Sequence, residues 1–205
     1  MILSKRLLIS PYKPNEVIAE ITTAGTPTVT LKTSGVYEIE AISGGAGGTV
    51  YDTLAAVIYL NTGSTGAYYR GKINIPAGTY TIKVGAGGRT GAMSAGGAGG
   101  QTSIGNIFVL RGAGATGTSS TGTVGSLTSI SGEVERIQYA IGKSGGSYPN
   151  YGTMHDPWHG DVSCPAVNYG FNSSYGKGGH AIYTDNGYDL GAGGSGYLKI
   201  TYKGR

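Results

Sequence analysis

The sequence predicts an all-β fold, a β-sandwich-like glycine-rich domain with packed polyglycine II-type segments. Forty of the 205 residues are glycine, and they gather in short blocks beside apolar, β-branched stretches. Only 13% of the residues are charged, about half the usual share of ~25%, which argues against solvated disorder. Since glycine loses more backbone entropy on ordering than any other residue, such blocks at strand ends indicate close backbone packing.

The glycine blocks follow no strict period along the chain, which excludes a collagen triple helix. Paired glycines suit extended, left-handed segments with three residues per turn. Several such rods can lie side by side and hydrogen-bond laterally, which satisfies the backbone groups that an isolated segment leaves unpaired. The densest blocks are 44–48, 85–88, 96–100 and 191–194.

Alternating residues predict strands through the rest of the chain. In 36–42, Tyr37 and Ile39 fall on one face, and Glu38 and Glu40 fall on the other. We expect further strands at 28–31, 102–110 and 196–202, and a hairpin of 72–75 and 79–84 joined by Pro76-Ala77-Gly78. The run 54–60 favours a strand over two helical turns, and 133–141 fits either a helix or a strand.

The length of the chain predicts one domain with a short appendage. Residues 1–24 differ in composition from the rest, and Pro11 and Pro14 disfavour a continuous helix, so this segment is expected to be an attachment arm. Residues 25–205 form the glycine-rich β domain, with an aromatic loop region at about 143–190. No apolar run approaches the ~20 residues that span a bilayer, and residues 1–10 are too short an apolar run for a secretory signal.

Charge, cysteine content and missing motifs exclude several classes of partner and chemistry. The net charge is +4, and the fifteen Lys and Arg residues are scattered, so no basic stripe predicts nucleic-acid binding. The single cysteine, Cys164, excludes an internal disulfide. The sequence has no His-Glu-x-x-His motif and no recognisable pair of carboxylates for acid–base work, so we predict neither an enzyme nor a cofactor.

Several motifs together resemble a known family. They are Ser34-Gly35-Val36-Tyr37, Ile75-Pro76-Ala77-Gly78-Thr79-Tyr80 leading into Val84-Gly85-Ala86-Gly87-Gly88, the segment 99–105, and the closing segment 191–202. Over about residues 33–203 the chain is similar to the glycine-rich domains of bacteriophage tail-fibre and adhesin proteins. A similar domain occurs in the ectodomain of anaplastic-lymphoma-kinase-type receptors. The chain departs from the phage proteins in its shorter glycine blocks and its long aromatic segment at 142–190.

The resemblance implies a β-rich scaffold of packed polyglycine helices whose loops bind a bacterial surface receptor, either a glycan or an outer-surface protein. It also implies a virion tail protein that is assembled in the host cytoplasm, joins other virion proteins through residues 1–24, and is compatible with a trimeric homo-oligomer. The alternative is a purely structural virion or cell-surface protein, in which the glycine domain is a spacer or an oligomerisation element.

One short segment combines metal-ligating residue types. His155 and His159 have the i, i+4 spacing of zinc ligands, and Asp161 or Cys164 would complete a site. Pro157 lies between the histidines and disfavours one helical face that holds both. We therefore predict an aromatic recognition loop here, with no metal; the alternative is a metal-dependent enzyme built on His155, His159 and Asp161.

Aromatic and amide residues interleave through the region at about 143–190. Tyrosine and tryptophan rings beside amides and carboxylates suit sugar rings and adaptable protein surfaces. The alternative for any single tyrosine is packing between the layers of the scaffold. The residues predicted to bind the receptor are Tyr148, Tyr151, His155, Trp158, His159, Tyr169 and Tyr175.

Overall fold

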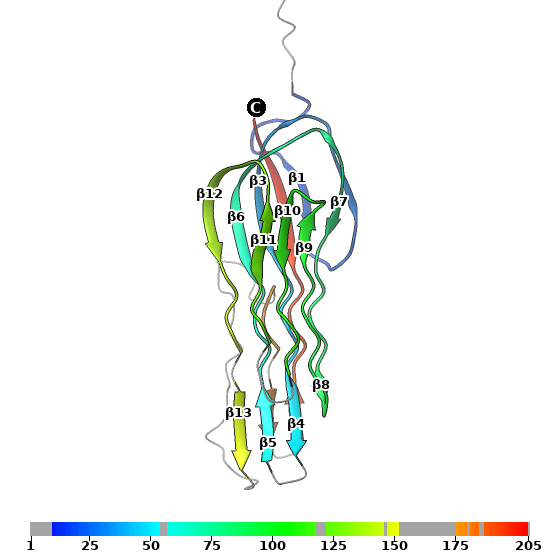
Figure 1. Ribbon diagram of the computed structural model, residues 1–205. Helices are drawn as coiled ribbons and strands as arrows, with labels where there is room; N and C mark the ends of the chain where they lie inside the picture. Colours follow the sequence, from blue (N-terminus) through cyan, green and yellow to red (C-terminus); the bar gives the residue numbers. More distant parts are fainter. Residues whose placement is uncertain are drawn as a thin grey trace, which may run out of the picture.

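The computed structural model describes residues 10–53, 57–117, 122–145, 147–151, 175–179, 181–184 and 187–204. Within strands, the backbone alone is described at 52–53, 57–59, 147–151, 182–184 and 187–188. The molecule is elongated, with a sandwich of two sheets at one end, a bundle of extended segments in the middle and two small sheets at the other end (Figure 1). The described residues contain strands and no helix, which confirms the all-β prediction.

The first sheet of the sandwich has five antiparallel strands. The closing strand lies near its middle, beside the strand that carries the alternating Glu38 and Tyr37. In spatial order the strands are β1 (Val17–Ile21), β16 (Tyr197–Gly204), β3 (Gly35–Ile42), β6 (Tyr68–Ile75) and β12 (Glu133–Ala140).

The second sheet also has five strands, and they are shorter. Its order is β11 (Ser126–Ile130), β10 (Phe108–Arg111), β9 (Thr102–Ile104), β7 (Gly78–Lys83) and β2 (Thr28–Leu31). The inner faces of the two sheets form one apolar core, in which the ring centroids of Tyr69 and Phe108 lie 5.0 Å apart. Tyr37 is also buried there and donates a 2.6 Å hydrogen bond to the carbonyl of Thr33.

Two details of the predicted strand pattern are wrong. Strands β6 and β7 do not pair as a hairpin, because each buries its own apolar face and they belong to opposite sheets, with Ile73 and Ile82 in the same core. The stretch 102–110 is a hairpin of β9 and β10, because Gly105 turns the chain with a φ of 46°. The two segments that the sequence left open are strands: β12 occupies 133–140, and β5 (Val57–Asn61) overlaps the predicted 54–60.

Part of the segment at 1–24 packs on the sandwich. Strand β1 is an edge strand of the first sheet, and the amide of Asn15 donates to the carbonyl of Tyr202. The ring of Tyr12 lies 5.5 Å from that of Tyr202, and its hydroxyl accepts a hydrogen bond from the Lys32 amide. The predicted attachment role of residues 1–24 stays a prediction, and residues 1–9 lie outside the described part of the chain.

The middle of the molecule is a bundle of glycine-rich segments, called here the rod bundle, with residues 43–48 at its centre. Successive amides of this central rod donate to three different neighbours in turn. Gly44 and Gly47 donate to the segment 96–100, Gly45 and Gly48 to 191–194, and Ser43 and Ala46 to 62–67. A repeat of three residues is the period of the polyglycine II helix.

The carbonyls of the central rod accept from three further segments. Ala113 and Thr116 donate from one rod, Gly88 and Gly91 from a second, and Gly179 from a third. The central rod is therefore surrounded by rods on all sides and has few unsatisfied backbone groups, as burial away from water requires. Segments 122–125 and 141–145 add two outer rods, since Gly125 donates to Thr65 and Gly142 donates to Gly125.

Glycine is required in the rods because the backbones approach too closely for a side chain. A Cβ atom at Gly45 would overlap the carbonyl oxygen of Lys177, and one at Gly87 would overlap that of Gly193. Small hydroxyl residues occupy some remaining buried positions. Ser43 Oγ donates to the carbonyl of Arg111 at 2.9 Å and accepts from the amide of Ala67 at 2.8 Å.

The far end of the bundle carries two small sheets. The larger one, called here the tip sheet, has the order β13 (Ser147–Tyr151), β5, β4 (Thr49–Thr53) and β8 (Gly91–Ala92). The other is the hairpin of β14 (Ala181–Thr184) and β15 (Gly187–Leu190). Val50, Leu60, Ala181 and Leu190 form a separate small core between them.

Candidate functional site

The two ends of the molecule differ in what they carry. The first described residues, at Ser10, and the last strand, β16, belong to the sandwich end. Strands β13, β14 and β15, which belong to the aromatic region at about 143–190, lie at the opposite end, beyond the rod bundle (Figure 1). The rods thus separate strands β13, β14 and β15 from the described ends of the chain.

Strand register places two tyrosines and a proline from a distant part of the sequence in one row of the tip sheet. Tyr51 of β4 is paired with Tyr59 of β5, which is paired in turn with Pro149 of β13. Tyr151 lies two positions after Pro149, and therefore on the same face of the sheet. Because β13 is an edge strand, it tolerates a proline that cannot donate to a neighbour.

The opposite face of the tip sheet is covered. Val50 and Leu60 are paired with each other and pack in the small core with the β14–β15 hairpin. Tyr148 is paired with Leu60 and so lies on that covered face, opposite to Tyr151. Tyr51, on the other face, is half-buried.

Hydrogen bonds tie the tip sheet to the rod bundle. The buried Thr49 hydroxyl donates to the carbonyl of Gly91, in β8 of the same sheet, at 2.5 Å and also contacts that of Ser94, which follows β8. The buried Asn61 amide donates to the carbonyl of Gly117 at 3.1 Å. The tip is therefore held in a fixed position on the rods.

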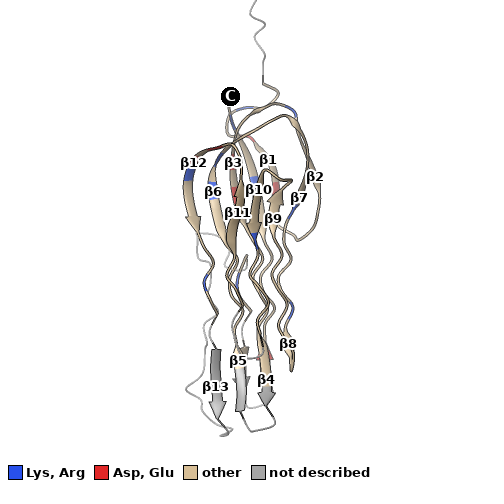
Figure 2. Cartoon of the chain, in the orientation of Figure 1, with Lys and Arg blue, Asp and Glu red and all other residues tan. Residues whose placement is uncertain are grey.

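Charge is distributed unevenly along the molecule. The strands of the tip, β4, β5, β8, β13, β14 and β15, contain no lysine or arginine and carry Asp52 and Asp189. The rods carry cations such as Arg89, Lys143 and Lys177, and the sandwich carries both signs (Figure 2). The tip is thus the acidic end of the described structure.

The outer face of the first sheet is a second charged surface, and its charges are paired. A shallow groove there is lined by residues that include Glu38, Arg70 and Lys203. Glu38 lies 2.8 Å from Arg70 and 3.0 Å from Lys203. Burial alone would raise the pKa of the Glu38 carboxyl, but hydrogen bonds from Lys203 and Arg70 outweigh burial and hold the pKa below its usual value. These contacts stabilise the sheet and leave this carboxylate occupied.

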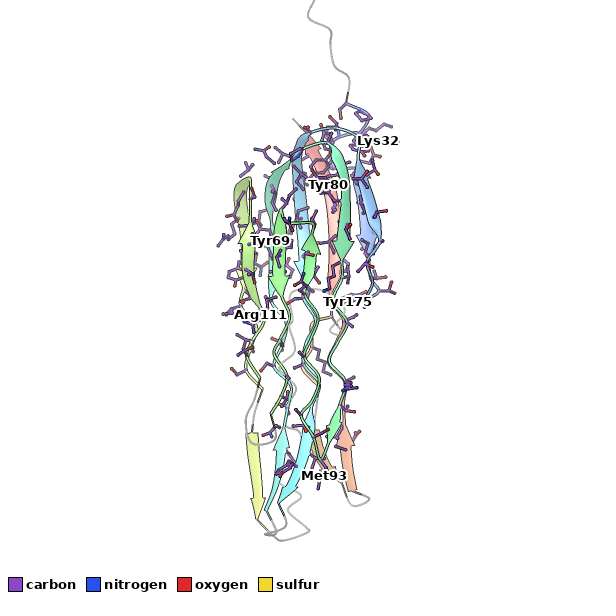
Figure 3. All side chains as sticks on the ribbon, turned by 45° about the vertical axis from the view of Figure 1, so that its right-hand side comes forward. Lys32, Tyr69, Tyr80, Met93, Arg111 and Tyr175 are labelled. Carbon is purple, nitrogen blue, oxygen red and sulfur yellow. The ribbon has the colours of Figure 1, made fainter. Side chains whose placement is uncertain are left out.

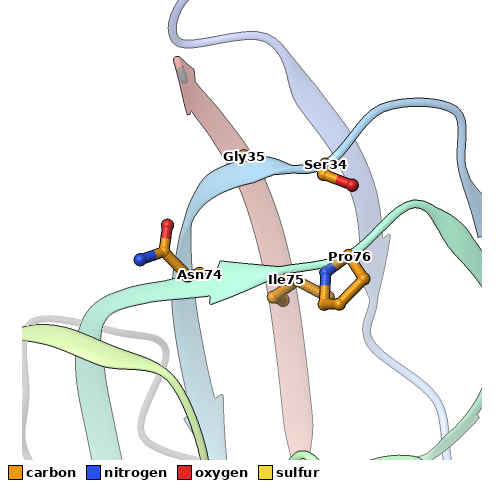
Figure 4. Close-up of a pocket in the computed structure, with 5 residues that line it drawn as sticks. All are labelled: Ser34, Gly35, Asn74, Ile75 and Pro76. Atoms are coloured by element: carbon orange, nitrogen blue, oxygen red, sulfur yellow. The ribbon is translucent and has the colours of Figure 1, made fainter.

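A small pocket lies at the sandwich end. It is lined by Ser34, Gly35, Asn74, Ile75 and Pro76, where β3 begins and β6 ends (Figure 4). The Ser34 hydroxyl already accepts a 2.8 Å hydrogen bond from the backbone amide of Ala77. None of the lining residues titrates near neutral pH.

The predicted receptor-binding residues fall into three groups. Tyr148 and Tyr151 lie on β13, on opposite faces of the tip sheet. Tyr175 is half-buried near the sandwich, where its ring lies 5.3 Å from that of Tyr197 (Figure 3). His155, Trp158, His159 and Tyr169 lie outside the described residues, and their role stays a prediction.

The metal alternative is untested in the same way. Asp161 and Cys164, like the two histidines, lie outside the described part of the chain. Within the described ranges, no group of three or more His, Cys, Asp or Glu residues is arranged to hold a metal ion. No helix of the described structure is long and apolar enough to cross a membrane.

Sequence reasoning missed three features of the tip. Tyr51 and Tyr59 were not among the predicted contacts, because the pairing of β5 with β13 joins segments about ninety residues apart. Met93 was also missed; it is 56% exposed in a left-handed turn after β8. The alternation of Val50, Tyr51 and Asp52 was the available signal for a two-faced strand.

No protein-family model matches this chain, and a search of curated proteins finds no match either. The fold therefore stands on the structure alone, and the function is inferred from the arrangement of the tip, the rods and the sandwich.

Proposed function

We propose that the protein is a bacteriophage tail-fibre component that binds a bacterial surface receptor through the aromatic region at about 143–190. The observation that supports this best is the separation of the two ends. The described N-terminal residues and β16 belong to the sandwich, whereas β13, β14 and β15 lie beyond the rod bundle. An elongated scaffold of this kind holds a contact surface away from its point of attachment.

The construction of the rods supports a mechanical role in presenting that surface. Each amide of the central rod is bonded to a neighbouring rod, and the tip sheet is fixed to the bundle through Thr49 and Asn61. Rigid presentation lowers the entropy lost on binding. Residues 1–24 are proposed to join the sandwich end to other virion proteins.

A structural role without receptor binding is the second candidate. Its support is the outer face of the first sheet, where ion pairs such as Glu38 with Arg70 give a solvated, self-satisfied surface. Under this reading the rod bundle is a spacer or an oligomerisation element, and the tip makes no contact with a cell.

Binding of the fluorescently labelled protein to a panel of bacterial strains separates the two candidates. The proposed function predicts saturable binding to some strains and a loss of tenfold or more in affinity for Trp158→Ala and Tyr151→Ala. Tyr80→Ala is the matched control, because Tyr80 is a half-buried tyrosine at the sandwich end. Absence of binding to any strain, or equal binding of all variants, contradicts the proposed role of this region.

A further inference from the structure

The face of the tip sheet that the β14–β15 hairpin does not cover gathers ring-bearing residues from three strands. Tyr51, Tyr59 and Pro149 share one cross-strand row, and Tyr151 follows on the same face. We propose that this face is a platform for neutral sugar rings of a bacterial surface polysaccharide. The inference rests on the proposed function and names its ligand class and its contact residues.

The residue types on this face match the chemistry of a sugar ring. A tyrosine has an apolar ring and a hydroxyl that hydrogen-bonds at its edge. A pyranose likewise has C–H groups on its ring faces and hydroxyls around its rim. Adjacent strands lie about 4.8 Å apart, so the row Tyr51–Tyr59–Pro149 spans roughly 10 Å, the length of a disaccharide.

The charge of the tip selects among glycans. The strands that form the tip contain no lysine or arginine, and Asp52 and Asp189 give them negative charge. Asp52 adjoins Tyr51 along β4 but lies on the opposite face of the sheet, and Asp189 belongs to the hairpin that covers that face. A polymer rich in phosphate or uronate would therefore find a negative field nearby and no cation on these strands to pair with. Neutral hexoses need no such cation, so they are the ligand that this surface fits.

The next row toward the rods marks where the platform begins. Thr49 and Asn61 are paired in that row and are both fully buried, and their side chains donate to the carbonyls of Gly91 and Gly117. These side chains are therefore engaged inside the protein. They also hold β4 and β5 in place, so the backbone of the next row is preorganised.

The test uses polysaccharides purified from the surface of strains in the panel and immobilised on a sensor. We expect the full-length protein to bind at least one neutral polysaccharide, and Tyr51→Ala and Tyr59→Ala each to weaken it tenfold or more. Tyr51→Phe keeps the ring, so its affinity should stay within about threefold of the original protein. For scale, a tenfold loss of affinity corresponds to 1.4 kcal/mol. Tyr80→Ala, at the far end of the molecule, should leave the affinity unchanged.

Saturation-transfer NMR on the unmodified protein guards against variants that fail to fold. Saturation of the aromatic protons should pass to the C–H protons of the bound sugar if rings stack on it. Binding without such transfer, equal affinity of the alanine variants, or no binding to any polysaccharide overturns the platform. If cells still bind but lose binding after protease treatment, the receptor is a protein, and the proposed function survives without this inference.

Discussion

Single glycines decide whether the rod bundle can close. At the central rod the backbone of one segment touches the backbone of the next, so the cost of a methyl group depends on what lies beside each Cα. Gly45 faces the carbonyl of Lys177, whereas Gly25, at the edge of the sandwich, has only Pro27 Cδ at 3.9 Å. Glycine content alone does not separate these two positions.

We predict that Gly45→Ala lowers the free energy of unfolding by about 2–3 kcal/mol, since a backbone segment must move to admit the methyl group. Gly25→Ala is the matched control and should stay within about 0.5 kcal/mol of the original protein. Chemical denaturation of both variants measures the difference. Equal stability of the two variants would show that the rods are not packed backbone to backbone.

Met93 is a second residue whose backbone carries a cost. Its φ of 56° lies in the left-handed region, which costs a residue with a side chain about 1–2 kcal/mol. Asn15, the other such residue in the described structure, is of a type that tolerates this conformation. The strained residue is also 56% exposed, at the side of the tip (Figure 3).

Met93→Gly should therefore raise the free energy of unfolding by up to about 1 kcal/mol, because strain is relieved and little apolar surface is lost. The amide of Met93 donates to the carbonyl of Val50, and glycine keeps that bond. The midpoint of guanidinium denaturation reports the change. If the Met93→Gly variant unfolds at a lower guanidinium concentration than the original protein, the backbone at Met93 is not strained.

At the scale of elements, the first sheet combines an apolar inner face with a polar outer face. Tyr37, Ile39 and Ala41 are fully buried, while Glu38 and Glu40 between them reach the outer face. Glu38 is 12% exposed and lies between two cations. Its pKa is lower in the folded protein than the ordinary value of 4.5.

The sign of this shift predicts how stability depends on pH. A carboxyl with a depressed pKa in the folded state stabilises the protein fully above its unfolded pKa, and that stabilisation is lost as the pH falls through the folded value. Glu38→Gln should therefore cost about 1 kcal/mol at pH 7 and progressively less below pH 4. Urea unfolding at both pH values gives the comparison. A deficit that is the same at pH 7 and pH 3 would exclude the ion pairs as its source.

The positions of the strands were predictable from the sequence where polar and apolar residues alternate regularly. Which strands pair with one another was not predictable. The faces of β3 and β16 follow directly from the period of two, and the lateral bonding of glycine segments follows from their lack of side chains. The prediction that β6 and β7 form a hairpin was wrong, because a short turn in the sequence does not reveal that the chain crosses from one sheet to the other. For the rods, the sequence does contain a local signal of a helix with three residues per turn. Ser43, Ala46 and Thr49 recur every third residue and are separated by pairs of glycines.

At the tip, too, the sequence does not reveal which strands pair. Tyr148 and Tyr151 were singled out from the aromatic region, but their partners Leu60 and Val57, and with them Tyr59, come from far upstream. No local pattern encodes that register. Their separation onto two faces of one sheet follows only once the strand is assigned.

At the scale of the whole molecule, the sandwich and the tip have separate apolar cores, and hydrogen-bonded rods connect them. The larger core lies between the two five-stranded sheets, and the smaller one contains Val50 and Leu60. The rods have almost no apolar side chains to bury, so their order depends on lateral bonds and on both ends being folded. This arrangement transmits position along the molecule without a continuous hydrophobic core.

Hydrogen–deuterium exchange of the protein bound to outer-surface vesicles from a strain that it binds tests the account most directly. The proposed function predicts slower exchange in β4, β5, β13 and the adjoining aromatic region, and unchanged exchange in the sandwich strands β1, β16, β3 and β6. Protection confined to the sandwich, with the tip exchanging as in the free protein, would contradict the claim that the tip is the contact end.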